Sequence, residues 1–130
     1  MIKRNLTEIF VFGSNLSGIH GAGAALHAKK YYGAKVGIGE GITGNSYAIP
    51  TKGRIGKDKK FPILPLDQVE FSLERFIRYA KKQSYLEEPS LFLLTPIGTG
   101  LAGHNKKDIW NILKKHYIPN NVVLTKSWIK

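Results

Sequence analysis

Short apolar runs alternate with amphipathic stretches along this chain. Strands are predicted at residues 7–12, 45–50, 91–94 and 122–124, with a brief one around Val36. Helices are predicted at residues 22–32, 67–83 and 105–116. Strands that alternate with helices in this way indicate a central mixed, largely parallel sheet with helices on both faces. We therefore expect an α/β protein with three layers, α/β/α.

The helix predicted at residues 67–83 is the clearest of the three. Asp67 is expected to cap it, and its acidic side chains come early and its basic ones late, as the helix dipole favours. The basic, Gly- and Pro-rich segment 54–66 before it is expected to be either a mobile lid or a wrap around the sheet edge. For the helix at 22–32, Asn15 and His20 are the candidate caps.

Two predicted strands run into glycine-rich turns that open helices. The first turn carries Gly18, Gly21 and Gly23, and the second carries Gly98, Gly100 and Gly103. Such turns let backbone N–H groups approach a phosphate at the positive end of a helix dipole. The carboxyl ends of parallel strands meet at one sheet edge, so the two turns are expected to hold a diphosphate between them. Alternatively, each turn only packs a helix onto the sheet.

Composition and charge limit the classes of partner that the protein is expected to bind. The 130 residues suffice for one domain, and 20 Lys and Arg against 9 Asp and Glu give a formal charge of +11. This balance favours polyanions such as nucleic acid or nucleotides, or else reflects a general richness in lysine. The chain has no cysteine, and its His, Asp and Glu lack metal-ligand spacing, so no metal is expected. No long apolar run or signal peptide is visible, which predicts a cytoplasmic protein without a membrane partner.

Three segments in order, VFGSNLSGIHGAGAALHAKK, SYAIPTKG and TPIGTGLAGHNKKDIWNIL, resemble a macrodomain, the ADP-ribose-binding module. The chain is most similar to the branch that holds the terminal ADP-ribose protein glycohydrolase and the DNA ADP-ribosyl glycohydrolase antitoxins. That branch shows an Asn before a G-x-G-A turn, then FPTK, then P-x-G-C-G-L-G-G. The matching positions here are Asn15, Gly21, Ala22, Gly23, Ile49, Pro50, Thr51, Lys52, Pro96, Gly98, Thr99, Gly100, Leu101 and Gly103.

The match differs from the family pattern at three places. Thr99 stands where the family usually has Cys, and the Asp that binds the adenine amine is missing. The Asp that follows the last glycine loop of the protein glycohydrolase is also missing. Since the antitoxins lack that second Asp too, they are the nearer relatives.

The resemblance implies a glycohydrolase that removes ADP-ribose from nucleic acid or protein without a cofactor. Lys52 would attack the anomeric carbon of the distal ribose as a neutral amine, a form that desolvation or nearby positive charge favours. Glu40, alone among three glycines, is the carboxylate best placed to activate water or orient a ribose. The expected ligand-binding residues are Asn15, Gly18, His20, Gly21, Ala22, Gly23, Thr51, Pro96, Ile97, Gly98, Thr99, Gly100, Leu101 and Gly103.

Other interpretations stay open. The protein could instead be a non-catalytic module that binds ADP-ribose or a related nucleotide, or a phosphatase of ADP-ribose 1″-phosphate. Lys52 could be a solvated charge after a strand, Asn15 a turn residue, His20 a surface histidine and Glu40 an exposed loop acid.

Overall fold

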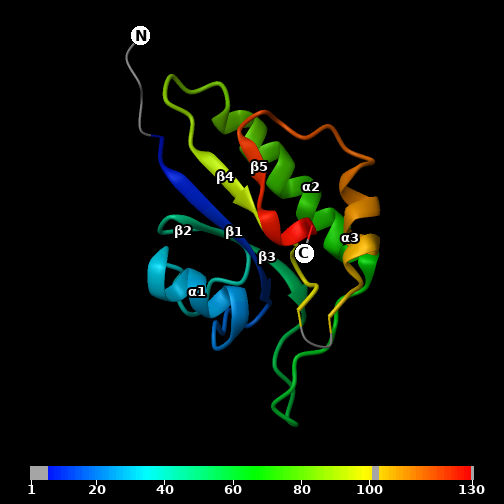
Figure 1. The fold of residues 1–130 in the computed structure, drawn as a ribbon. Coiled ribbons are helices and arrows are strands. Elements are labelled where there is room, and N and C mark those ends of the chain that lie inside the picture. Colours follow the sequence, from blue (N-terminus) through cyan, green and yellow to red (C-terminus); the bar gives the residue numbers. More distant parts are fainter. Residues whose placement is uncertain (1–5, 101–102, 130) are drawn as a thin grey trace.

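Five strands form one mixed sheet at the centre of the fold (Figure 1). The computed structural model describes residues 6–100 and 103–129. Its strands are β1 (Glu8–Asn15), β2 (Gly41–Thr43), β3 (Ser46–Lys52), β4 (Leu91–Leu94) and β5 (Val122–Leu124). Their order is β2-β3-β1-β4-β5, and every pairing is parallel except that of β2 with β3. The prediction of a mixed, largely parallel sheet is confirmed.

Helices cover both faces of this sheet. Helix α1 (Gly23–Tyr31) lies on one face, and α2 (Leu66–Gln83) and α3 (Lys106–Leu113) lie on the other. A short 3₁₀ helix, η1 (Lys126–Ile129), follows β5. The three-layer α/β/α arrangement is therefore confirmed (Figure 1). Within the described part of the chain, no helix combines the length and apolar character needed to cross a membrane.

The side chains of β1 alternate between the two cores, as a strand buried on both faces requires. Ile9 and Val11 join the larger core under α2 and α3, which also holds Phe76 and Phe92. Phe12 joins the smaller core under α1, whose other buried members are Ala28, Ala34 and Ala48. These small residues let α1 pack closely on the sheet, as the alanine pattern predicts.

Strand β1 is longer than predicted. It continues past Phe12 through Gly13 and Ser14 to Asn15, because all three residues pair with β3. The strand expected around Val36 is absent; Val36 lies in an exposed turn, and the edge strand is β2 instead. Sequence reasoning missed β2 because this short strand begins at a glycine, Gly41, and is followed by another, Gly44.

The predicted helix caps of α1 and α2 are wrong. The N-cap of α1 is Ala22, so neither Asn15 nor His20 caps that helix. Asp67 lies inside the first turn of α2, after an N-cap at Pro65, and its carboxylate accepts from the backbone N–H of Gln68. Helix α3, for which no cap was predicted, is capped by Asn105, whose side chain accepts from the N–H of Lys107 at 2.8 Å.

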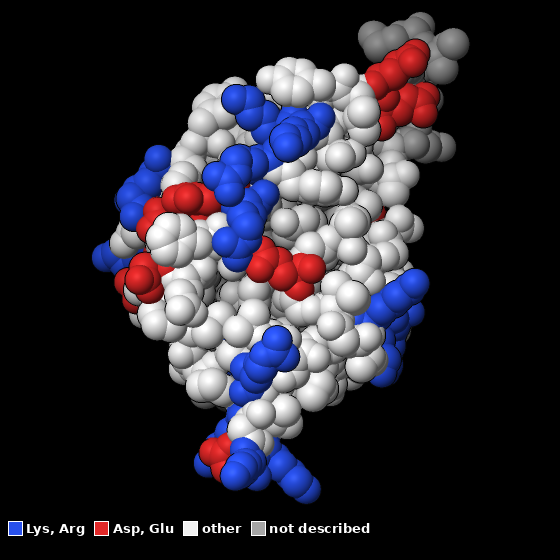
Figure 2. All heavy atoms as spheres, turned by 180° about the vertical axis from the view of Figure 1, so that it is seen from behind, with Lys and Arg blue, Asp and Glu red and all other residues white. Residues whose placement is uncertain are grey.

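Residues 53–65 form a projection beyond the carboxyl end of β3, at the bottom of Figure 1. Its two arms pair like a hairpin, with Gly53 donating to the carbonyl of Pro62 at 2.7 Å and an antiparallel bridge between Lys52 and Ile63. The segment does not wrap around the sheet edge. In Figure 2, Lys and Arg gather at its tip beside an acidic side chain, and further basic groups lie elsewhere on that face.

Candidate functional site

A cleft of about 450 Å³ opens at the sheet edge where the parallel strands β1, β3 and β4 end. This is the edge at which open α/β sheets bind their ligands, and the volume suits a small-molecule site. It is lined by Gly13, Ser14, Asn15, Ile19, Gly21, Ala22, Gly23, Ala24, Ala25, Thr51, Lys52, Phe61, Thr95, Pro96, Ile97, Gly98, Gly100 and Gly103. Both glycine-rich turns therefore reach one cleft, together with Lys52.

Close packing joins the second glycine-rich turn to the ends of β1 and β3 beside the cleft. A Cβ atom on Gly13 would lie 2.7 Å from the backbone nitrogen of Gly98, and one on Gly98 would lie 2.8 Å from the Cβ of Thr51. Gly98 also has a φ of +70°, which favours glycine. The ends of β1 and β3 thus meet the loop after β4 at a distance that only glycine permits.

The N-terminus of α1 forms one wall of the cleft. Ala22, Gly23, Ala24 and Ala25 all line it, and Ala22 has no side-chain oxygen that could cap the helix. The first N–H groups of a helix have no partner within the helix. They carry partial positive charge and can donate to an anion such as a phosphate.

Asn15 and Lys52 are neighbours on adjacent strands. They pair across β1 and β3 just after an irregularity in the register, and the N–H of Leu16 donates to the carbonyl of Lys52 at 3.0 Å. The Asn15 amide closes the following turn: Nδ2 donates to the carbonyl of Ile19 at 2.9 Å, and Oδ1 accepts from its N–H at 3.1 Å. An amide offers two hydrogens and two lone pairs, so one of each remains for a ligand.

Lys52 is the one ionisable side chain among the described residues that line the cleft. The other polar groups there are the side chains of Asn15, hydroxyl groups and the backbone. Phe61, from the 53–65 projection, adds an aromatic ring that sequence reasoning missed. The available signal was its position as the one aromatic residue in that basic segment.

Three expected ligand-binding residues do not line the cleft. Gly18 is buried against the backbone of Gly37, and the Thr99 hydroxyl donates to the carbonyl of Pro96 at 2.7 Å. The ring of His20 is only 1% exposed; it packs edge-on against Phe12, and its Nε2 donates to the carbonyl of Lys35 at 3.1 Å. These residues shape the turns rather than face a ligand. Leu101 lies outside the described residues.

Glu40 also lies away from the cleft. Its carboxylate receives two hydrogen bonds from the guanidinium of Arg75 on α2, at 2.5 and 2.9 Å. This pairing raises the pKa of Arg75. Burial, followed by the nearby charge of Glu40, raises the pKa of Tyr47 to about 12. The carboxylate is therefore a structural partner of α2, and the geometry gives it no route to a ligand in the cleft.

We expect Glu40→Gln to leave any turnover in the cleft unchanged. The variant should lose about 0.5–1 kcal/mol of stability, because a partly exposed ion pair contributes little. Urea denaturation and a turnover assay on the same preparation check both points. A loss of turnover without loss of stability would restore Glu40 as a catalytic candidate.

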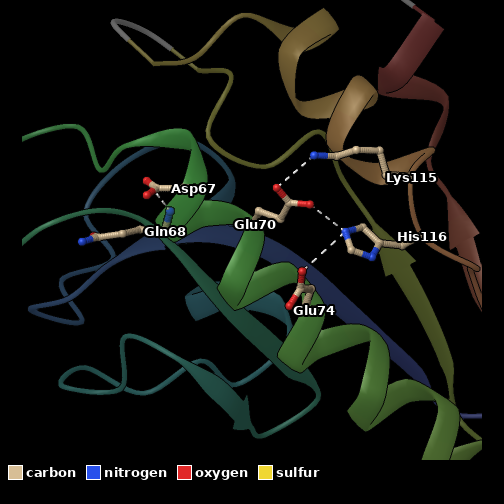
Figure 3. A network of polar contacts seen from close by, with 6 residues as sticks. All are labelled: Asp67, Gln68, Glu70, Glu74, Lys115 and His116. Carbon is tan, nitrogen blue, oxygen red and sulfur yellow. Dashed lines mark hydrogen bonds and ion pairs between the residues drawn. The ribbon is translucent and has the colours of Figure 1, made fainter.

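A second polar cluster lies between α2 and the segment after α3 (Figure 3). Glu70 accepts from Nε2 of His116 at 2.9 Å and from the ammonium of Lys115 at 3.1 Å. Glu74, one turn further along α2, has its Oε1 3.8 Å from the same His116 nitrogen. The side-chain atoms of Glu70, Glu74 and His116 that could bind a metal ion all lie within 4.8 Å of one another. The spacing of these residues in the sequence does not reveal this grouping. Here the Glu70 carboxylate already accepts hydrogen bonds from both basic side chains.

This cluster gives a pH-dependent contribution to stability. The hydrogen bond from His116, followed by that from Lys115, lowers the pKa of Glu70 below its ordinary value near 4.5. Its stabilisation is therefore complete above that pH and is lost as the pH falls through the pKa of the folded state. We expect Glu70→Gln to cost about 0.5–1 kcal/mol at neutral pH and nothing in acid. Urea denaturation across this range checks the prediction, with Glu74→Gln as the weaker control.

Comparisons with known proteins support the fold alone. The chain matches no family model and no curated protein. Among solved structures, it is similar to a protein of unknown function from Bacteroides thetaiotaomicron, with a TM-score of 0.61 and 15% identity over 94% of this chain and 87% of that one. At this identity, the likeness concerns architecture and carries no activity from one protein to the other.

Proposed function

We propose that the cleft binds ADP-ribose and that the protein is an ADP-ribosyl glycohydrolase with Lys52 as its nucleophile. The observation that carries the proposal is the position of Lys52. It is the one ionisable side chain among the described lining residues, in a cleft where two glycine-rich turns converge. A diphosphate needs backbone donors, and this edge of the sheet offers them.

Each part of the ligand has a matching group in the cleft. The N–H groups at the start of α1 and those of the loop around Gly98 and Gly100 suit the two phosphates. The remaining hydrogen and lone pair of Asn15 suit a ribose hydroxyl. Phe61 offers a ring on which adenine stacks, which would replace the missing Asp as the adenine-binding residue.

In the proposed reaction, the neutral amine of Lys52 attacks the anomeric carbon of the distal ribose. The bond from that carbon to the acceptor breaks, and the acceptor leaves with its electron pair and takes a proton. Water then cleaves the bond between the anomeric carbon and Lys52, which releases ADP-ribose and restores the amine. The role of Glu40 in activating this water is dropped, because its carboxylate is bound to Arg75.

One observation favours the alternative of a non-catalytic ADP-ribose-binding module. No carboxylate or imidazole is among the described residues that line the cleft, so the second step has no evident general base. A binding module needs none. The two proposals share the ligand and differ in turnover.

Calorimetry with ADP-ribose and AMP tests the shared part of the proposals. ADP-ribose should bind at least about tenfold more tightly than AMP, because the second phosphate and the distal ribose make further contacts. Equal affinities, or no binding of either, would refute the assignment of the cleft. The variant Lys35→Ala, at an exposed lysine outside the cleft, should bind ADP-ribose as the wild type does, which shows that the affinity does not come from the general positive charge of the protein.

A further inference from the structure

A second hollow, of about 550 Å³, lies beside the loop that separates β4 from α3. It is lined by Lys106, Lys107, Trp110, Leu124, Thr125, Lys126, Trp128 and Ile129, and we call it the Trp110 groove. Gly103 lines the cleft and Lys106 lines the groove, so only His104 and Asn105 separate the two hollows along the chain. The two hollows are therefore close to one another along the chain.

Both tryptophans of the chain lie in this groove. Their ring centroids are 5.7 Å apart with the planes tilted by 59°. Trp128 is fixed, since its Nε1 donates to the carbonyl of Leu94 at 2.8 Å and its ring packs on the larger core. Trp110 leans on this fixed ring and is 41% exposed. The groove thus presents an aromatic surface that is both rigid and accessible.

Lysines flank this aromatic surface. Lys107 and Lys126 are exposed on its rim, from α3 and η1 respectively. Lys106 has a structural part, as its ammonium donates to the carbonyl of Ser127 at 2.7 Å and holds η1 against α3. An adjoining hollow of about 370 Å³ shares Trp110 and Leu124 with the groove and adds the exposed Lys114. Basic side chains therefore follow the hollows on both sides of Trp110.

We infer that the Trp110 groove binds single-stranded nucleic acid, with a base stacked on Trp110 and phosphates near Lys107 and Lys126. Aromatic rings between basic side chains are the usual arrangement for single strands, because every base has a face to stack. A duplex keeps those faces covered, and an acidic peptide would use the lysines but not the ring. The inference rests on the proposed function in one respect: the strand would carry the ADP-ribosylated nucleotide into the neighbouring cleft.

Intrinsic fluorescence tests this inference directly, because both tryptophans lie in the groove. Unmodified oligothymidylate and oligouridylate of about twelve nucleotides are the probes, a length that suits single-strand sites. We expect both to quench the fluorescence, with an affinity that falls as salt rises. The ratio of the two affinities shows whether the groove prefers DNA or RNA. A duplex of equal length and polyglutamate should bind without quenching, and equal quenching by either would overturn the inference.

Variants locate the site. Trp110→Ala should weaken oligonucleotide binding about tenfold or more, measured by anisotropy of a labelled strand, and the double variant Lys107→Glu/Lys126→Glu should weaken it similarly. The matched controls are on α1, at the opposite face of the sheet: Tyr31→Ala for the aromatic and Lys29→Glu/Lys30→Glu for the charges. Thermal melts confirm that each variant folds. Equal losses in the control variants would overturn the inference.

The same measurements separate this inference from the proposed function. The oligonucleotides carry no ADP-ribose, so their binding does not depend on the cleft. Strand binding without ADP-ribose binding would refute the proposed function and leave the groove standing. ADP-ribose binding without quenching by either strand would refute the inference about the groove and leave the proposed function standing.

Discussion

Replacing Lys52 with alanine is expected to lower glycohydrolase turnover by about 10³-fold or more, the scale on which enzymes lose rate when a covalent nucleophile is removed. Affinity for ADP-ribose should fall far less, because the backbone donors of the two glycine turns and of α1 remain. The measurement is release of ADP-ribose from an ADP-ribosylated oligonucleotide and an ADP-ribosylated peptide, alongside calorimetry with free ADP-ribose.

Lys52→Arg distinguishes a nucleophile from a simple counter-charge. Arginine keeps the positive charge beside the phosphates but remains protonated and cannot attack carbon. If Lys52 is the nucleophile, both variants are inactive and Lys52→Arg binds ADP-ribose nearly as well as the wild type. Turnover that survives in Lys52→Arg would rule out the proposed mechanism. Turnover absent from the wild type, with binding intact, would leave the non-catalytic module as the function.

The sequence predicts the main architecture because each element carries a local pattern. The apolar runs within β1 and β4 and the periodic stretch of α2 each specify an element with little help from the rest of the chain. Strand β2 has only three residues, of which the first is Gly41, and its pairing with β3 decides its existence. Elements of that kind depend on tertiary contacts, which no local window contains.

The candidate site likewise has features that local patterns predict and features that depend on tertiary contacts. Glycines that follow a strand predict a turn at the sheet edge, and the parallel order of β1, β3 and β4 then brings the turns together. Glu40 and His20 could not be placed in this way. The partner of Glu40 is Arg75, far along the chain, and His20 turns inward because the Asn15 amide closes the turn before it. Proximity in sequence to a glycine turn did not bring either side chain to the cleft.

Gly98→Ala should be a strongly damaging methyl addition in the cleft. The new Cβ would lie 2.8 Å from the Cβ of Thr51, a buried side chain on β3, and would occupy a residue with a φ of +70°. Strain and overpacking together predict a loss of about 2–4 kcal/mol in the free energy of unfolding. The loop after β4 would have to move away from β3, which would widen the cleft beside Lys52 and weaken ADP-ribose binding.

Alanine variants at two other glycines distinguish backbone strain from overpacking as the cause of this loss of stability. Gly37 has a φ of +96° but open space around its added Cβ, so Gly37→Ala should cost only about 1 kcal/mol, from backbone strain. Gly100 lines the same cleft with no heavy atom within 4 Å of its added Cβ, so Gly100→Ala should change stability by less than about 0.5 kcal/mol. Urea denaturation of the three variants measures these costs. If Gly98→Ala proves no worse than Gly37→Ala, the loop after β4 moves easily away from Thr51, and the cleft does not depend on close packing of that loop against β3.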